Sequence, residues 1–199
     1  MKNILVSFLA FVVTCFGVSP SFAGAYISGN LGAVIVNDSD IDDGVDTGEF
    51  SYDTGFGFVA ALGTSTQYGV RVEAELGYRK NDFDEIEVDG LGSADLDGDI
   101  TTTSLMGNAY YDFSSDGSFS PYIGAGFGYA NVEADFDNSG DEDDNVYAYQ
   151  FILGGSFASS ETLSVDLQYR YFATDDPDFD GLESEYSSHN IMIGLRHSF

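Results

Sequence analysis

Cysteine, tryptophan and basic residues are scarce in this chain of 199 residues, and the scarcity of cysteine and of basic residues excludes several classes of protein. The single cysteine is Cys15, and tryptophan is absent. A lone cysteine excludes an internal disulfide framework and a metal site built from several thiolates. Only 6 Lys and Arg stand against 34 Asp and Glu, which gives a net charge of −28. Nucleic acid is excluded as a partner, because a polyanion repels a chain of this charge.

Long apolar runs are also missing after the first 23 residues. Lys2 precedes an apolar stretch from Ile4 to Val18, and Ser21-Phe22-Ala23 follows as a small-x-small cleavage signal. We expect residues 1–23 to be a cleaved secretory signal peptide, with a second possible cleavage site after Ala25. Residues 24–199 then form the mature domain. No later stretch approaches the roughly 18 consecutive apolar residues of a transmembrane helix.

The chain is instead rich in a two-residue alternation of apolar and polar side chains. It is clearest in Val70–Arg79, where every second residue is apolar. This period indicates a β-strand with one apolar and one polar face. Eight segments share it, each with about the 10 residues that a tilted strand needs to cross a bilayer. They are Tyr26–Asn37, Phe50–Thr64, Val70–Arg79, Thr101–Phe113, Tyr122–Asn131, Val146–Phe157, Leu163–Phe172 and His189–Phe199.

The connections between these segments alternate in length. Three are short: Thr64–Gly69, Ser114–Ser120 and Ala158–Thr162. Four are long: Asp38–Glu49, Lys80–Asp99, Val132–Asn145 and Ala173–Ser187, which together hold 27 of the 34 acidic residues and one lysine. Short turns opposite long loops are typical of outer-membrane barrels. The sequence therefore predicts an all-β fold, an eight-stranded antiparallel up-and-down transmembrane β-barrel, with extracellular loops and periplasmic termini.

A soluble eight-stranded barrel of the lipocalin type would place its apolar side chains inside. The aromatic residues argue against it, because they gather at both ends of the apolar face, as at two membrane interfaces. Those near the loops are Phe50, Tyr52, Tyr78, Tyr129, Tyr147 and Tyr171, and those near the turns are Tyr111, Phe113, Phe157 and Phe199.

The polar face carries four arginines against five acids, one of them Asp53, and this near balance suits a closed interior filled with ion pairs. We expect a lumenal ionic network there. Its members are Arg71, Glu73, Glu75, Arg79, Asp112, Asp166, Arg170 and Arg196.

Five short runs carry a resemblance to a known family. They are Tyr26–Gly32 (YISGNLG), Arg71–Leu76 (RVEAEL), Asn108–Phe113 (NAYYDF), Pro121–Tyr129 (PYIGAGFGY) and Leu167–Phe172 (LQYRYF). As a set they resemble the opacity-protein/OmpA-type family of small outer-membrane barrels. The resemblance implies a barrel domain without the peptidoglycan-binding domain of longer relatives. It also implies that Phe199 is a signal for the outer-membrane assembly machinery, although His197 stands where the family more often has Tyr.

The acidic loops contain a candidate metal site. Asp176, Asp178 and Asp180, followed by Gly181, match the first half of a calcium loop. The closing Glu is missing at the twelfth position, where Ser187 stands, so a solvated, self-repelling loop is the alternative. A third possibility is diffuse bridging by calcium or magnesium to the phosphates of lipopolysaccharide. We expect no other cofactor.

Two hypotheses of function remain open. The first is a monomeric structural and surface-interaction protein, adhesin-like, whose acidic loops meet an extracellular ligand while the barrel sits among outer-membrane lipid and lipopolysaccharide. The alternative is a narrow porin that passes small solutes or ions. We expect no enzymatic activity, because neither His189 nor His197 is placed beside a nucleophile as the base of a hydrolytic triad.

Overall fold

The computed structural model describes residues 24–199 except 38, 43–46, 89–91, 96–97, 114–117, 137–139, 176–177, 180–181 and 184–185. In several strand residues beside these gaps, it describes the backbone alone. The expected signal peptide, residues 1–23, lies outside the described residues, so its cleavage stays a prediction. Within the described ranges, no helix is long and apolar enough to cross a membrane.

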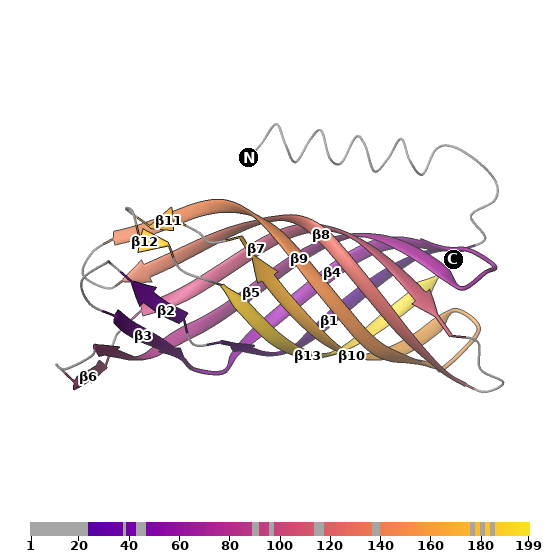
Figure 1. Cartoon of the computed structure of the whole chain (residues 1–199). Helices are drawn as coiled ribbons and strands as arrows, with labels where there is room; N and C mark the ends of the chain where they lie inside the picture. Colours follow the sequence, from indigo (N-terminus) through magenta and orange to yellow (C-terminus); the bar gives the residue numbers. More distant parts are fainter. Residues whose placement is uncertain are drawn as a thin grey trace.

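In the described part of the chain, eight long strands close into one antiparallel barrel (Figure 1). Each pairs with the next along the chain, and the first pairs with the last over eleven residues, from Tyr26 opposite Ser198 to Val36 opposite Ser188. The strands are β1 (Gly24–Val36), β4 (Gly55–Ser65), β5 (Val70–Val88), β7 (Gly98–Asp112), β8 (Phe119–Phe136), β9 (Gly140–Ala158), β10 (Leu163–Thr174) and β13 (Ser187–Ser198). The eight-stranded barrel that the alternation predicts is confirmed.

The two ends of the barrel differ. At one, which we call the turn end, short connections join β4 to β5, β7 to β8 and β9 to β10, and the carboxyl terminus lies there (right in Figure 1). The opposite, loop end carries five short strands. They are β2 (Ser39–Asp42), β3 (Thr47–Tyr52), β6 (Gly92–Asp95), β11 (Asp178–Phe179) and β12 (Leu182–Glu183).

Two of the expected loops, 80–99 and 132–145, are mostly paired strand. β5 continues to Val88, β8 reaches Phe136 and β9 starts at Gly140. The expected single strand Phe50–Thr64 is in fact two strands, because β3 ends at Tyr52 and pairs with the far part of β5. The density of acidic residues concealed these strands in the sequence, although the apolar residues between the acids keep a period of two.

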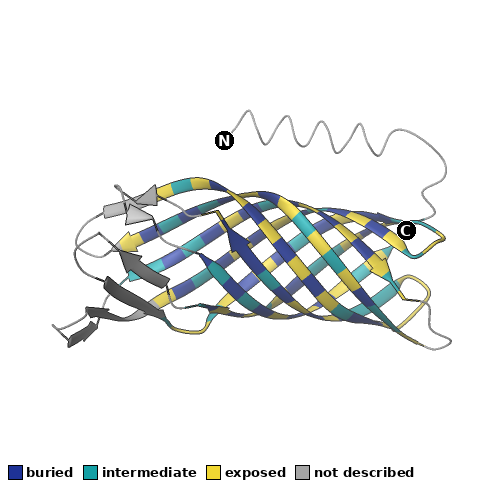
Figure 2. Cartoon of the chain, in the orientation of Figure 1, coloured by how far each residue is buried: buried dark blue, intermediate teal, exposed yellow. Residues whose placement is uncertain are grey.

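In the turn-end half of the barrel the apolar face is outside. Leu31, Phe151 and Leu153 are among the outward residues, each about 60% exposed, and polar side chains fill the interior. Figure 2 shows the alternation of exposed and buried positions along the described parts of the eight barrel strands. This half has the inside-out pattern that the sequence predicts for a barrel in lipid.

In the loop-end half the two faces exchange character. The interior holds an apolar core of buried residues: Val34, Val36, Ile100, Met106, Ala130, Val132, Ala134, Val146, Ala148, Phe172 and Tyr186. Toward the loop-end rim of β5, β7, β8 and β9 the outward positions are polar, among them Lys80, Asp82, Asp99, Thr101, Asn131, Glu133, Asp135, Asp143 and Asn145. Nearer the middle of the barrel, outward residues beside the same core are still apolar or aromatic: Ile35, Tyr129, Tyr147 and Tyr149. The barrel is therefore inside out on the turn-end side of these aromatic residues, and beyond them β5, β7, β8 and β9 have the sidedness of a soluble barrel.

Most of the aromatic side chains expected at the two interfaces do face outward. Tyr129 and Tyr147 pair on the outer surface with ring centroids 4.8 Å apart, and Tyr111 and Phe113 pair near the turn end at 5.1 Å. Tyr52 differs, because it packs against the apolar core. The Phe50 side chain lies outside the described residues.

Candidate functional site

All eight residues of the predicted ionic network face the interior of the barrel. β5 supplies Arg71, Glu73, Glu75 and Arg79, β7 supplies Asp112, β10 supplies Asp166 and Arg170, and β13 supplies Arg196. Seven are buried or nearly so, and Asp112 is 26% exposed. The expectation for Asp53 is wrong: it is exposed at the break between β3 and β4, where the alternation is interrupted. The network thus balances four arginines with four carboxylates.

Arg71 is the centre of the first ionic group, near the turn end. Its Nε donates to both carboxylate oxygens of Asp112, at 3.0 and 2.8 Å, and its Nη1 lies 3.3 Å from Glu73 Oε1. The Tyr26 hydroxyl donates to the same Glu73 oxygen at 2.7 Å. Arg71 therefore has two acidic partners, which compensate the cost of burying its charge.

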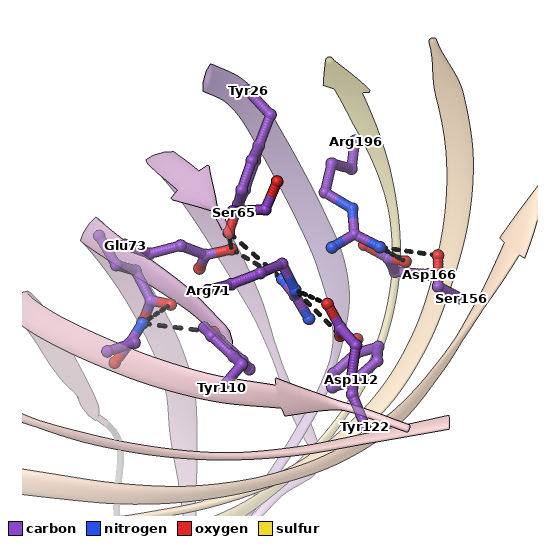
Figure 3. A network of polar contacts seen from close by, with 12 residues as sticks. Tyr26, Ser65, Arg71, Glu73, Tyr110, Asp112, Tyr122, Ser156, Asp166 and Arg196 are labelled. Atoms are coloured by element: carbon purple, nitrogen blue, oxygen red, sulfur yellow. Dashed lines mark hydrogen bonds and ion pairs between the residues drawn. The ribbon is translucent and has the colours of Figure 1, made fainter. Parts of the chain in front are cut away.

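Figure 3 shows this group beside a second one, the pair of Arg196 and Asp166. Arg196 Nη2 lies 3.3 Å from Asp166 Oδ1 and donates to the Ser156 hydroxyl at 2.7 Å. Three strands, β9, β10 and β13, meet through these contacts.

Glu75 and Arg170 form the third group, deeper in the barrel. The two are fully buried, and Arg170 Nη1 donates to Glu75 Oε2 at 2.7 Å. Asn108 donates to the same oxygen at 2.7 Å, while Gln150 donates to Oε1 at 3.0 Å. Both oxygens of Glu75 are occupied, whereas Arg170 has Glu75 as its one acidic partner among the described residues.

Arg79 stands apart, between the charged groups and the apolar core. Its Nε donates to Asn190 Oδ1 at 3.1 Å and its Nη1 to the Ser104 hydroxyl at 3.2 Å. The Phe172 ring covers the guanidinium, with Cζ 3.8 Å from the ring centroid, a cation–π contact. A side chain at Gly77 would meet both Ser104 and Arg79, so glycine there leaves room for the arginine.

Three interior tyrosines each lie over a glycine that stands directly opposite on the next strand. The pairs are Tyr26 with Gly63, Tyr110 with Gly124, and Tyr122 with Gly154. All three rings face the guanidinium of Arg71, at 4.4 to 5.9 Å from Cζ to the ring centroids. Tyr26 and Tyr122 were not expected in the interior, and the opposing glycines were the signal that could have revealed them.

We expect Gly124→Ala to lower the free energy of unfolding by about 1–3 kcal/mol, because the new Cβ would overlap the ring of Tyr110 in a filled interior. Gly29→Ala is the matched control, since a Cβ there meets nothing within 4 Å. Urea titration of both variants refolded in lipid vesicles measures the difference. Equal stabilities would show that the tyrosine ring is free to move away.

The interior is closed by its own side chains. Tyr122, Gln150, Glu75 and Arg170 are fully buried in its charged part, and the apolar core lies beyond Arg79. A narrow eight-stranded barrel leaves just enough width for side chains to fill. The arrangement is that of a salt-bridged plug.

Neither histidine faces the interior. His189 Nδ1 is hydrogen-bonded to the Tyr169 hydroxyl at 2.7 Å on the outer face, and Tyr171 lies beside the ring. His197 packs against Phe199, with ring centroids 5.3 Å apart. These contacts are those of side chains in an aromatic belt.

The calcium candidates cannot be placed in the structure. Asp176 and Asp180, and the side chain of Asp178, lie outside the described residues. In the part of the chain that is described, no group of three or more His, Cys, Asp or Glu is arranged to hold a metal ion.

Comparisons with known proteins agree with this geometry. The family model described as "Outer membrane protein beta-barrel domain" matches residues 7–199. Outer membrane protein PagN of Salmonella typhimurium is 24% identical in an alignment of 245 residues that covers all of both chains.

Two solved structures share the fold. Neisserial surface protein A (NspA) has a TM-score of 0.60 at 18% identity, over 88% of this chain and 97% of that one. The outer membrane protease OmpT of Escherichia coli has a TM-score of 0.51 at 8% identity, over 92% and 99%. At such identities the likeness shows the fold alone. The family model, in contrast, spans nearly the whole sequence, so the chain belongs to the family of outer membrane protein β-barrel domains and is a protein of the bacterial outer membrane.

Proposed function

We propose that this chain is a structural and surface-interaction protein whose loop-end half stands outside the membrane and presents an acidic wall. The observation that carries the proposal is the exchange of sidedness along the barrel. Polar residues such as Asn131, Glu133 and Asn145 would be costly in lipid, whereas they suit a wall in water. The apolar core then supports this wall as it would in a soluble barrel.

The loop end faces the outside of the cell in this proposal, and the termini face the periplasm. The short turns at one end and the long connections at the other support this orientation. Neisserial surface protein A, which shares the fold, carries the name of a surface protein, and this also supports the outward orientation.

The acidic wall has a regular construction. Asp82, Asp99, Asp135 and Asp141 stand opposite one another on β5, β7, β8 and β9, and we call these four the acidic row. Like charges directly opposite on neighbouring strands are destabilising. An ion pair between Lys80 Nζ and Asp99 Oδ2, at 2.8 Å, relieves part of this repulsion. Such a row favours cationic partners.

The scarcity of basic residues on the outer surface explains why these partners would include metal ions. Of the six in the sequence, Lys2 belongs to the expected signal peptide and the four arginines lie inside the barrel. Lys80 is the one left for the outer surface. Contact with the phosphates of lipopolysaccharide would therefore depend on divalent cations between phosphate and carboxylate.

We expect binding of lipopolysaccharide to the protein in phosphatidylcholine nanodiscs to require magnesium. The double variant Asp82→Asn/Asp135→Asn should weaken this binding several-fold, because it removes half of the acidic row. The double variant Asp175→Asn/Glu161→Gln changes the net charge equally at exposed positions outside the row and serves as the control. Binding that is unchanged by removal of magnesium with EDTA would contradict the proposal.

The sealed interior argues against the alternative of a narrow porin. Because the charged groups and the apolar core fill successive levels of the barrel, we expect liposomes that contain the protein to take up small sugars no faster than empty liposomes. Light scattering during swelling measures this uptake. Rapid swelling would instead support the hypothesis of a narrow porin.

A further inference from the structure

Arg79 is fully buried and, among the described residues, has no carboxylate partner. The other interior arginines each pair with at least one acid, and Lys80 pairs with Asp99. The guanidinium uses Nε and Nη1 in hydrogen bonds to neutral groups, while its Nη2 is buried without a hydrogen-bond partner. A buried charge without a counter-charge is costly, and the Phe172 ring supplies only part of the compensation.

Glu75 does not serve as the counter-charge of Arg79. Glu75 lies within electrostatic reach, but Arg170, Asn108 and Gln150 already occupy both of its oxygens. A shift of Glu75 toward Arg79 would leave Arg170, also fully buried, without its acidic partner.

Two more hydroxyls beside Arg79 are buried, those of Thr102 and Tyr186. They lie within reach of each other, and Tyr186 also of Ser188, but neither makes a hydrogen bond of good geometry. Thr102 stands directly opposite Arg79 on β7. Tyr186 lies close to Thr102 and within electrostatic reach of Arg79, and its ring packs on the same Phe172 that covers the guanidinium. These three groups, the Nη2 of Arg79 without a hydrogen-bond partner and two hydroxyls without a well-formed hydrogen bond, can all donate.

We propose that Arg79, Thr102 and Tyr186 bind a small monovalent inorganic anion of the halide type inside the barrel. An anion accepts hydrogen bonds from all three donors at once and neutralises the guanidinium. The site lies where the charged interior meets the apolar core, so the anion is enclosed as the barrel assembles. It acts as a structural ligand that completes the plug.

The first test uses bromide, whose anomalous scattering identifies it. The full-length mature protein is refolded from urea in bromide buffer and crystallised, and we expect an anomalous peak within hydrogen-bonding distance of Arg79 Nη2. A map with water alone at this position, or with no density, would overturn the proposal. This measurement needs no variant.

The second test compares thermal unfolding in bromide and in gluconate at equal ionic strength. Bromide should raise the unfolding midpoint of the unmodified protein, because a ligand that binds only the folded state stabilises it. Thr102→Val and Tyr186→Phe each remove one donor while nearly keeping its shape, and each should weaken the bromide affinity by about tenfold. Ser156→Ala removes an interior hydroxyl beside Arg196 instead and should keep the full bromide shift. Equal shifts in all four proteins would refute the site.

Discussion

Replacing Glu75 by glutamine should lower the free energy of unfolding by roughly 3–5 kcal/mol, the usual effect of leaving one member of a buried ion pair without its partner. Arg170 would remain fully buried with its positive charge uncompensated, since Glu75 is its one acidic partner in the described structure. Urea-induced unfolding in lipid vesicles measures the change. Far-ultraviolet circular dichroism follows it, because the chain has no tryptophan for fluorescence.

Glu73→Gln is the matched control for this result. Glu73 is also buried and paired with an arginine, but Arg71 keeps the two contacts of its Nε to Asp112. We therefore expect a much smaller loss from Glu73→Gln than from Glu75→Gln. The double variant Glu75→Gln/Arg170→Gln should recover much of the loss, because no unpaired charge remains. If both single variants lost the same stability, the second acid on Arg71 would have no compensating effect.

The second large effect tests the exchange of sidedness with arginine at three positions. Val72→Arg places a charge on the lipid-facing surface and should cost about 2–4 kcal/mol if it lies near the membrane midplane. Val132→Arg places the charge in the apolar core and should cost at least about 3 kcal/mol. Asn145→Arg adds the same charge to the outer wall of the loop-end half and should change stability by no more than about 0.5 kcal/mol.

A barrel that is inside out along its whole length would give a different order. Asn145 would then face lipid and Val132 a polar lumen, so Asn145→Arg would be the more harmful of the two. Refolding yield in vesicles and urea titration distinguish the two orders. A mild effect of Val132→Arg would remove the basis of the proposed extramembrane wall.

The sequence was sufficient for the barrel and for the members of its ionic network because both follow from a period of two. Arg71, Glu73 and Glu75 face inward for the same reason that Val70 and Val72 face outward. The period alone could not tell which carboxylate meets which arginine, because pairing depends on strand register. Thus the isolation of Arg79 from the acids became visible only in three dimensions.

The loop-end half was harder to predict for a different reason. In 132–145, Val132 and Ala134 keep the alternation on β8, but the acids that follow resemble a solvated loop. The same alternating pattern serves a strand in lipid and a strand in water, with the faces reversed. Composition of each face, taken level by level along the barrel, was the signal that could have separated them.

The pairing of β1 with β13 has a consequence for the synthesis of the protein. Its eleven matched residues join the first and last strands of the described chain, so the hydrogen bonds that close the barrel are the most distant in sequence. Until the final strand arrives, the sheet has two unsatisfied edges, and such edges invite pairing with other chains. Loop closure over so long a segment is also slow. Newly made copies should therefore depend on a chaperone up to the addition of the last strand, and a chain cut before Ser187 should aggregate rather than form a smaller barrel.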